Sequence, residues 1–217
     1  GGDLFDRAFV SGTPLTIAGL HTYGVQMVAG VQHIHSLGIA HLDIKPENFW
    51  LDADGTLMLA EFGLARRMPV NTIPGGTPQY AAPELTRYSA PLNGYAVDVW
   101  AAGVTLLMIS ISRNPFALTE FAPSADGDLH NRPAGRAVLT AVLRLTKAAQ
   151  DAGRNGVLAA CDYFTDKKGV NAFRELPEGL QKLLNGMLFV DPALRLTIQQ
   201  VAEDPWLVYP PTPQYSR

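Results

Sequence analysis

The stretch His41-Leu42-Asp43-Ile44-Lys45-Pro46-Glu47-Asn48, followed thirteen residues after Asn48 by Glu61-Phe62-Gly63, carries more information than any other part of this chain. Asp43, Lys45 and Asn48 lie close enough in sequence to converge on one short loop. Such a loop supplies a base, a cation and a metal ligand where a phosphate, a hydroxyl and a metal ion meet. The pattern therefore predicts phosphoryl transfer.

The residues on either side predict how this loop is held. From residue 16 to residue 37 the apolar side chains recur at spacings of three and four, which indicates an amphipathic helix, and Gly38 is placed to cap its end. Residues 48–51 and 56–60 are short apolar runs around the polar loop Asp52-Ala53-Asp54-Gly55, the pattern of a β-hairpin. A hairpin here would bring Asp43 and Glu61 side by side.

The remainder of the chain is predicted to be mainly helical. Residues 64–83 contain four prolines and the pair Gly75-Gly76, so this segment is expected to be irregular and to lie over the surface. Between residues 118 and 162 the composition shifts to Ala, Gly, Arg and Asp, which we interpret as an insertion around one helical stretch. The predicted fold class is mainly α with a small β-hairpin, and its later helices are expected at 97–111, 138–149, 179–189 and 197–202.

The composition excludes several classes of function. An apolar share of 47% over 217 residues describes a globular protein with a sizeable core. The net charge of −3 and the lack of a long Lys/Arg cluster argue against nucleic acid as a partner. The longest apolar run, residues 99–111, is shorter than the roughly 20 residues that span a bilayer, so we expect a buried core helix and no membrane partner. A single cysteine, Cys161, fits a reducing, intracellular compartment, and we predict a cytoplasmic location.

The opening stretch resembles the catalytic loop of protein kinases, His-Arg-Asp-x-Lys-Pro-Glu-Asn, and Glu61-Phe62-Gly63 resembles their metal-binding Asp-Phe-Gly. Further segments agree with the serine/threonine protein kinase family in order and approximate spacing. The resemblance implies that Glu84 and Arg195 form an ion pair and that His41 packs under Phe62. The agreeing segments are Gly1-Gly2-Asp3-Leu4-Phe5-Asp6, Gly76-Thr77-Pro78-Gln79-Tyr80-Ala81-Ala82-Pro83-Glu84, Asp98-Val99-Trp100-Ala101-Ala102-Gly103, Asn114-Pro115-Phe116 and Asp191-Pro192-Ala193-Leu194-Arg195.

The resemblance implies that Asp43, Lys45 and Thr77 belong to the catalytic site. Asp43 would be the base that orients the substrate hydroxyl, and Lys45 would counter the charge on the transferred phosphoryl group. The spacing of Lys45 from Asp43, with Thr77 before Pro78, matches the serine/threonine kind of kinase rather than the tyrosine kind. The expected substrate is therefore a protein with a Ser or Thr acceptor.

The resemblance also implies the cofactors ATP and Mg²⁺. The metal ligands would be Asn48 and Glu61, and the side that binds ATP would contain Asp3, Glu47 and Trp50. Glu47 also stands where some members of the family recognise a substrate Arg upstream of the acceptor. A second interpretation therefore places Glu47 at the protein substrate.

Three residues depart from the family pattern. Leu42 replaces an Arg that pairs with a phosphorylated activation segment, and an apolar side chain cannot bind phosphate. Glu61 replaces an Asp, and its extra methylene moves the carboxylate by roughly 1.5 Å, a C–C bond length. Because Mg²⁺ demands near-ideal geometry, we expect reduced activity. Trp50 replaces an aliphatic residue under the adenine, where it would either overfill the pocket or stack on the base.

The sequence lacks a Gly-x-Gly-x-x-Gly loop and a Val-Ala-x-Lys strand, which in the family belong to the strand-rich N-terminal lobe. We therefore expect residues 1–217 to form a helical lobe only, without the N-terminal lobe, and to be inactive on their own because little of the nucleotide would be buried. A second hypothesis is a pseudokinase-like module that binds another protein without phosphotransfer. The oligomeric state is not predicted.

Overall fold

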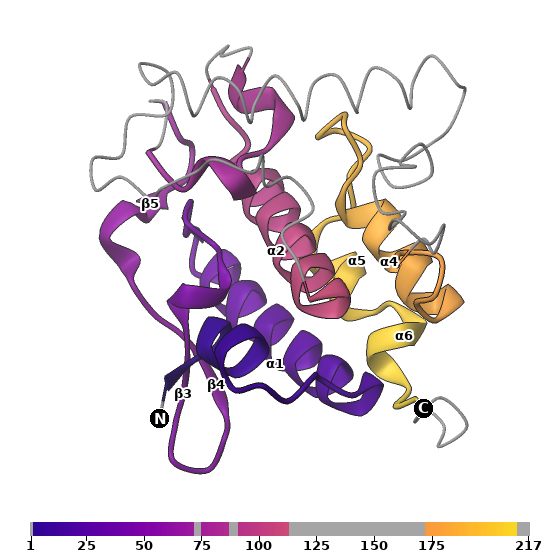
Figure 1. Cartoon of the computed structure of the whole chain (residues 1–217). Helices are drawn as coiled ribbons and strands as arrows, with labels where there is room; N and C mark the ends of the chain where they lie inside the picture. Colours follow the sequence, from indigo (N-terminus) through magenta and orange to yellow (C-terminus); the bar gives the residue numbers. More distant parts are fainter. Residues whose placement is uncertain (1, 72–74, 87–90, 113–171, 212–217) are drawn as a thin grey trace.

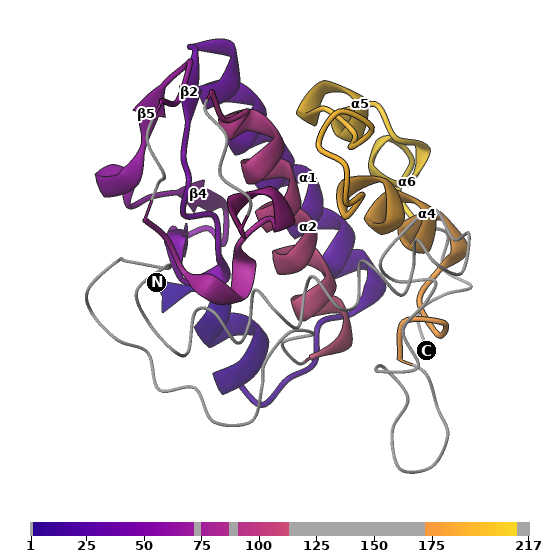
Figure 2. The same ribbon diagram turned by 90° about the horizontal axis from the view of Figure 1, so that it is seen from above.

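The computed structural model describes residues 2–71, 75–86, 91–112 and 172–211. Helices α1 (Ile17–Ser36) and α2 (Gly94–Ile111) lie side by side, and three shorter helices pack against them on one side (Figures 1 and 2). These are α4 (Glu178–Met187), α5 (Ile198–Ala202) and α6 (Pro205–Val208). The predicted insertion at 118–162, the predicted helix at 138–149 and Asn114-Pro115-Phe116 lie outside the described residues.

Helix α1 confirms the amphipathic pattern. Thr16 caps its N-terminus, since the Oγ1 atom accepts a hydrogen bond from the Gly19 amide at 3.1 Å. Gly38 follows the last turn with a φ of 76°, a conformation that costs a glycine little. The side chains that α1 buries against the core belong to Leu20, Met27, Val28, Val31 and Ile34.

Helix α2 is the centre of the core. Asn93 caps it through a bond from the Ala96 amide, and Trp100 inside it is fully buried. Gly103 lets α4 approach closely, because a Cβ atom there would lie 3.0 Å from side-chain atoms of Met187 and Leu188. By length and composition α2 passes as a membrane span, but 83% of it is buried within the protein, as expected for a core helix.

The predicted hairpin is present as β3 (Phe49–Leu51) and β4 (Leu57–Leu59), which pair antiparallel. Its turn is held by Asp52, whose Oδ1 atom accepts hydrogen bonds from the amides of Asp54 and Thr56 at 2.9 and 2.8 Å. One face of the hairpin packs on α1. The hairpin therefore fixes residues 48 and 60 relative to the core.

The predicted fold class, a mainly α helical lobe with a small β-hairpin and without a strand-rich N-terminal part, is wrong. Five strands lie between residues 2 and 67. β1 (Gly2–Asp3) joins β3 and β4 in a three-stranded sheet, and β2 (Ile39–Ala40) pairs antiparallel with β5 (Arg66–Arg67). A strand of two residues has no room for the alternation of apolar and polar side chains that identifies a strand in a sequence, so only its tertiary partner defines it.

Short helical turns occupy much of the remaining described backbone. A five-residue π-helix covers Asp6–Val10, and a 3-10 turn, Pro46–Asn48, lies in the loop between β2 and β3. The segment 64–83, which we expected to be irregular, contains β5 and a 3-10 turn at Pro78–Tyr80, and a second turn, Pro83–Thr86, begins at its last residue. These turns place Thr77 over the loop that carries Asp43.

Candidate catalytic site

The loop after β2 is anchored to α2 by one buried carboxylate. Asp98 is fully buried; its Oδ2 atom accepts from the His41 amide and its Oδ1 atom from the Leu42 amide, both at 2.7 Å. The same Oδ2 atom lies 2.9 Å from Nε2 of His35 on α1. Leu42 has a φ of 68°, a left-handed conformation that an L-residue with a Cβ adopts only at a cost. The two hydrogen bonds that the amides of residues 41 and 42 donate to Asp98 hold that conformation, and it directs Asp43 toward residue 77.

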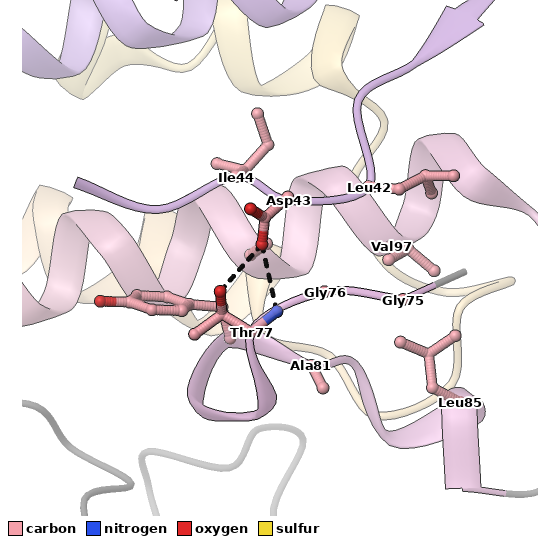
Figure 3. A pocket seen from close by; sticks show the side chains of 11 residues that line it. Leu42, Asp43, Ile44, Gly75, Gly76, Thr77, Ala81, Leu85 and Val97 are labelled. Carbon is pink, nitrogen blue, oxygen red and sulfur yellow. Dashed lines mark hydrogen bonds between the residues drawn. The ribbon is translucent and has the colours of Figure 1, made fainter. Parts of the chain in front are cut away.

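Asp43 is bonded on both of its carboxylate oxygens. Oδ1 accepts from the amide and the hydroxyl of Thr77, at 3.1 and 2.9 Å (Figure 3). Oδ2 lies 2.8 Å from Nζ of Lys45 and accepts from Nδ2 of Asn48 at 3.1 Å. Its side chain is only 14% exposed. Asp43 therefore has a single defined orientation before any substrate binds.

Lys45 and Thr77 complete the arrangement. Nζ of Lys45 donates to Oγ1 of Thr77 at 2.9 Å while it also pairs with Asp43. The Thr77 hydroxyl thus accepts from the cation and donates to the carboxylate. The loop can hold a hydroxyl between a base and a cation, which is the arrangement that hydroxyl phosphorylation requires.

Asn48 is 5% exposed, and its NH₂ group donates to the main-chain oxygen of Asp43 at 2.7 Å and to its side chain. That commitment leaves the carbonyl oxygen of Asn48 as the atom it can offer to a cation. The amide of Ala60 donates to the main-chain oxygen of Asn48 at 2.9 Å, so Glu61 follows directly on a residue paired with Asn48. The structure therefore brings these two predicted metal ligands to the same end of the hairpin.

Glu61 itself is held less firmly. It adopts a left-handed conformation, with φ 62° and ψ 61°, and its side chain is exposed. Within the described part of the chain its carboxylate makes no hydrogen bond or ion pair. Phe62, the next residue, contacts the ring of buried His41 with centroids 5.0 Å apart, and Nε2 of His41 lies 2.8 Å from the Ala60 oxygen. The predicted packing of His41 with Phe62 is confirmed.

The donors at this end of the hairpin fit a magnesium ion. A carboxylate and an amide carbonyl are oxygen ligands, which hard divalent cations prefer. Asn48 is fixed by its two hydrogen bonds, whereas the exposed Glu61 side chain is free to adjust. Both residues therefore have the type of oxygen atom that magnesium prefers, but only Asn48 is held in a fixed position.

Trp50 and Asp3 lie together on the outer face of the three-stranded sheet. They are directly paired between β1 and β3, and Trp50 is also paired with Met58 of β4. Trp50 is 49% exposed and Met58 47%. Asp3 accepts from the Asp6 amide at 2.8 Å. The indole is half-exposed, so one of its faces is open to solvent.

Glu47 sits in the 3-10 turn of the loop and is largely buried. Burial raises its pKa above the ordinary value, and its own backbone and the charge of Lys45 offset this only in part. Its Oε2 atom is buried and has no hydrogen-bond partner among the described residues. Burial, with the charges of Glu47 and Asp43, also raises the pKa of Tyr80. Glu47 therefore lies within reach of the charges of Lys45, Asp3 and Asp43.

Leu42 lies where the family has an Arg, and it is 5% exposed. It lines a small apolar pocket with Leu85 and Val97, beside Gly75 and Gly76 (Figure 3). A Cβ atom on Gly76 would come within 3.0 Å of the Leu42 oxygen, so this close approach needs a glycine. Residues 75 and 76 therefore lie against the loop that carries Asp43, through apolar and backbone contacts.

The predicted ion pair between Glu84 and Arg195 is confirmed. Two guanidinium nitrogens contact the two carboxylate oxygens at 2.7 and 2.8 Å, and Arg195 also donates to the Ala96 oxygen at 2.6 Å. The guanidinium lies over the ring of Trp100, 5.1 Å from its centroid. This pair ties the 83–86 turn to the start of α2 and to the segment before α5.

Sequence reasoning missed the anchoring function of His35 and Asp98. Asp98 was noted only as the first residue of a motif, although a charged residue at the start of a long apolar helix is a signal that a buried partner must exist. His35 gave no comparable signal, because its partner lies 63 positions away.

An aspartate held between a lysine and a hydroxyl, next to amide and carboxylate oxygens, is the arrangement of side chains that is typical of the kinase class. The family model described as "Protein kinase domain" matches residues 1–207, and the chain belongs to that family. The match overturns the prediction that the chain is only a helical lobe, because it extends over nearly all of the sequence, the strands at residues 2–67 included.

Curated relatives carry the same assignment. Serine/threonine-protein kinase chk1 of Schizosaccharomyces pombe is 29% identical over 219 residues, 95% of this chain and 36% of the relative. Serine/threonine-protein kinase stk11 of Xenopus laevis is 30% identical over 192 residues, 86% of this chain and 36% of the relative. CBL-interacting serine/threonine-protein kinase 8 of Arabidopsis thaliana is 29% identical over 98% of this chain and 40% of the relative. The chain thus spans less than half the length of these three relatives.

Proposed function

We propose that this site transfers the γ-phosphoryl group of ATP to a Ser or Thr hydroxyl of a protein. The observation that carries the proposal is the position of the Thr77 hydroxyl, which accepts from Lys45 and donates to Asp43 at 2.9 Å each. A substrate hydroxyl in an equivalent position would meet a base and a cation already in place. Such preorganisation is the main contribution that a protein makes to phosphoryl transfer.

Each residue of the loop has a defined task in this proposal. Asp43 accepts the hydroxyl proton and orients the oxygen toward the phosphorus, while Lys45 offsets the negative charge on the transferred group. Thr77 keeps Asp43 in its orientation and ties residues 75–77 to the loop. Because Lys45 already contacts both residues, it can move between them and a phosphate with small side-chain changes.

Asn48 and Glu61 would hold magnesium, and Asp3 and Trp50 would lie beside ATP. When bound, the ion supplies positive charge next to the phosphates. Trp50 offers an exposed aromatic face to the base, and Asp3, directly opposite it across the β1–β3 pair, offers a carboxylate to a ribose hydroxyl. The charges of Lys45 and Asp43 act on Glu47 from the side of the substrate, and the charge of Asp3 acts on it from the side of the nucleotide, so Glu47 stands between the two.

Glu61 supports a slow rather than a fast transfer. Its carboxylate is carried on one more methylene than an aspartate has, and in the described residues no contact fixes it. A misplacement of about 1 Å in a catalytic group costs on the order of a hundredfold in rate. The charge and ligand type remain suitable, so we propose that activity is reduced and not abolished.

A second candidate function is a protein-binding module without phosphotransfer, and the unfixed side chain of Glu61 is the observation that favours it. The two functions separate in one experiment on the full-length protein: transfer of labelled γ-phosphate from magnesium ATP to a mixture of Ser/Thr peptides. Asp43→Asn should reduce the rate by about 10²–10⁴-fold, the range for removing a general base. Equal rates in the wild type and Asp43→Asn would favour the binding module. An intracellular location and a protein substrate remain predictions.

A further inference from the structure

Met58 of β4 differs from the other methionines of the chain in its exposure to solvent. The chain has five methionines, and all of them lie within the described residues. Met27 and Met187 are fully buried and Met108 is 5% exposed, whereas Met58 is 47% exposed. A thioether that solvent reaches is open to oxidants, and one packed in a core is shielded from them. Exposure therefore singles out Met58 as the methionine that reacts first.

Two of the other methionines have contacts that occupy their sulfur atoms. Sδ of Met108 accepts a hydrogen bond from the Tyr80 hydroxyl at 3.3 Å. Met68 is partly buried against the core, and its Sδ lies so near Gly94 that a Cβ atom there would be 3.2 Å from it. An oxidant at either sulfur would have to displace a neighbouring group.

Met58 lies next to Trp50 on one face of the three-stranded sheet. The two are direct partners in the antiparallel pairing of β3 with β4, and Trp50 is also the partner of Asp3 on β1. Side chains of directly opposite residues share a face, with Cβ atoms about 4.5–5.5 Å apart. Figure 1 shows the two strands side by side near the N-terminus. A thioether and an indole so placed are within reach of a sulfur–aromatic contact, which needs about 5 Å.

We propose that Met58 is a site of reversible oxidation, at which a peroxide converts the thioether to a sulfoxide and thereby lowers the affinity of the neighbouring Trp50 surface for nucleotide. The modification stands on the exposure of Met58 and on its pairing with Trp50. Its effect on nucleotide rests on the proposed function, which places ATP beside Trp50.

The chemical step needs hydrogen peroxide and no other reactant. A lone pair of the Met58 sulfur attacks one peroxide oxygen, so that an S–O bond forms as the O–O bond breaks. The sulfur is oxidised by two electrons and the peroxide is reduced by two. The transferred oxygen gives its proton to the departing hydroxide, which leaves as water. Methionine sulfoxide reductases return the sulfoxide to the thioether, so the change is reversible.

A sulfoxide changes the surface around Trp50 in two ways. It replaces a flexible apolar group by a polar one, which removes the sulfur–aromatic contact that supports the half-exposed indole. It also places a partly negative oxygen on one side of the ring, while the carboxylate of Asp3 lies on the other side. Both changes are unfavourable for an aromatic base that carries phosphates.

Peptide mass analysis of the full-length protein after treatment with dilute hydrogen peroxide tests the site itself. Because burial shields the three core methionines, we expect Met58 to gain one oxygen at least about tenfold faster than Met27, Met108 and Met187. Met68, which is partly buried, should react at an intermediate rate. Equal rates at all five methionines, or a faster reaction at any other one, would overturn the proposal.

Tryptophan emission tests the contact between the two side chains. Trp50 is the exposed one of three tryptophans, since Trp100 is fully buried and Trp206 is 8% exposed. Oxidation of Met58 should therefore change the emission of the wild type and leave that of Trp50→Leu unchanged. An emission that stays the same in the oxidised wild type would show that the sulfoxide does not reach the indole, and the proposal would fail.

Calorimetric titration with magnesium ATP tests the functional effect. The oxidised wild type should bind about two- to tenfold more weakly than the untreated protein, the range for a lost sulfur–aromatic contact. Met58→Gln, which carries a polar group of similar length, should be weakened likewise without any oxidant. Met58→Leu should keep its affinity after peroxide, whereas Met68→Leu should stay as sensitive as the wild type.

Cys161, which lies outside the described residues, is a further sulfur that peroxide attacks. A loss of affinity that persists in Met58→Leu, or that dithiothreitol reverses, would assign the effect to the thiol and overturn the proposal. Reversal by a methionine sulfoxide reductase supports it. Unchanged affinity in both the oxidised wild type and Met58→Gln would also overturn it. A protein that binds no magnesium ATP before oxidation would contradict the proposed function instead, and the mass and emission results would still decide whether Met58 is the oxidised site.

Discussion

The two sides of the catalytic site are held to different degrees. On the side of the base, Asp43 has partners on both carboxylate oxygens, and Asp98 fixes the backbone before it from inside the core. On the side of the metal and nucleotide, Glu61 and Trp50 are exposed, and in the described residues the Glu61 carboxylate has no partner. The comparison teaches that one half of the chemistry is preorganised by the fold, whereas the other half depends on what binds there.

The largest effect is expected from Asp98→Ala, which removes the anchor on the side of the base. The change removes the acceptor of two backbone amides and leaves them buried without partners, with Leu42 in a left-handed conformation. We expect a loss of about 3–5 kcal/mol in the free energy of unfolding, measured by urea denaturation. The exposed Asp54→Ala is the matched control, with a change within about 0.5 kcal/mol. A similar small change for Asp98→Ala would show that the anchor is not what holds the loop.

The next largest effect is a gain in the rate of phosphotransfer, which we expect from Glu61→Asp on the side of the metal and nucleotide. The shorter side chain draws the carboxylate back by roughly one C–C bond and tolerates the left-handed backbone better than Glu does. We expect phosphotransfer by the full-length protein to rise by about 10–100-fold, measured as labelled phosphate incorporated into peptide. Glu175→Asp, also at an exposed position, controls for the loss of a methylene. An unchanged rate would mean that the position of the Glu61 carboxylate does not limit the reaction.

A smaller effect is expected from Trp50→Leu. Since the side chain is half-exposed, the free energy of unfolding should change by less than about 0.5 kcal/mol. Loss of an aromatic contact of about 0.5–1.5 kcal/mol should weaken binding of magnesium ATP by roughly two- to tenfold in calorimetric titration. Met58→Leu, the cross-strand neighbour, should leave the affinity nearly unchanged. Tighter binding in Trp50→Leu would show that the indole obstructs the nucleotide.

The smallest effect concerns Glu47 and pH. Its folded-state pKa is raised by burial, so the folded state favours the protonated carboxyl. Its contribution to stability is fully present below the ordinary pKa of 4.5 and is lost as the pH rises through the raised value. Glu47→Gln should therefore gain in melting temperature relative to the wild type between pH 4 and pH 7. A difference that stays constant with pH would contradict the raised pKa.

Some of this comparison was predictable from the sequence, and the reasons differ by element. Helix α1 and the β3–β4 hairpin follow from local periodicity and a Gly-bearing turn, and the ion pair of Glu84 with Arg195 followed from the family resemblance. The two-residue strands β1, β2 and β5 were not predicted, because pairing across the fold defines them and no local pattern does.

For the site, the sequence singled out Asp43, Lys45, Asn48 and Thr77, and the structure shows that the last three all contact Asp43. It did not show that Asp98 holds them: a charged residue in an apolar helix indicates a buried partner, but nothing local identifies residues 41 and 42 as that partner. Trp50 was interpreted as a choice between overfilling and stacking; the structure shows that the side chain is half-exposed, and the titration of Trp50→Leu decides between the two.

The most direct test of the proposed chemistry is the rate of labelled phosphate transfer by full-length Glu61→Asp, measured with and without Asp43→Asn in the same molecule. If Asp43 is the base and the position of the Glu61 carboxylate limits the rate, Glu61→Asp is faster than the wild type. The double variant then loses about 10²–10⁴-fold of that rate. A double variant as fast as Glu61→Asp alone would contradict the assignment of Asp43 as the base.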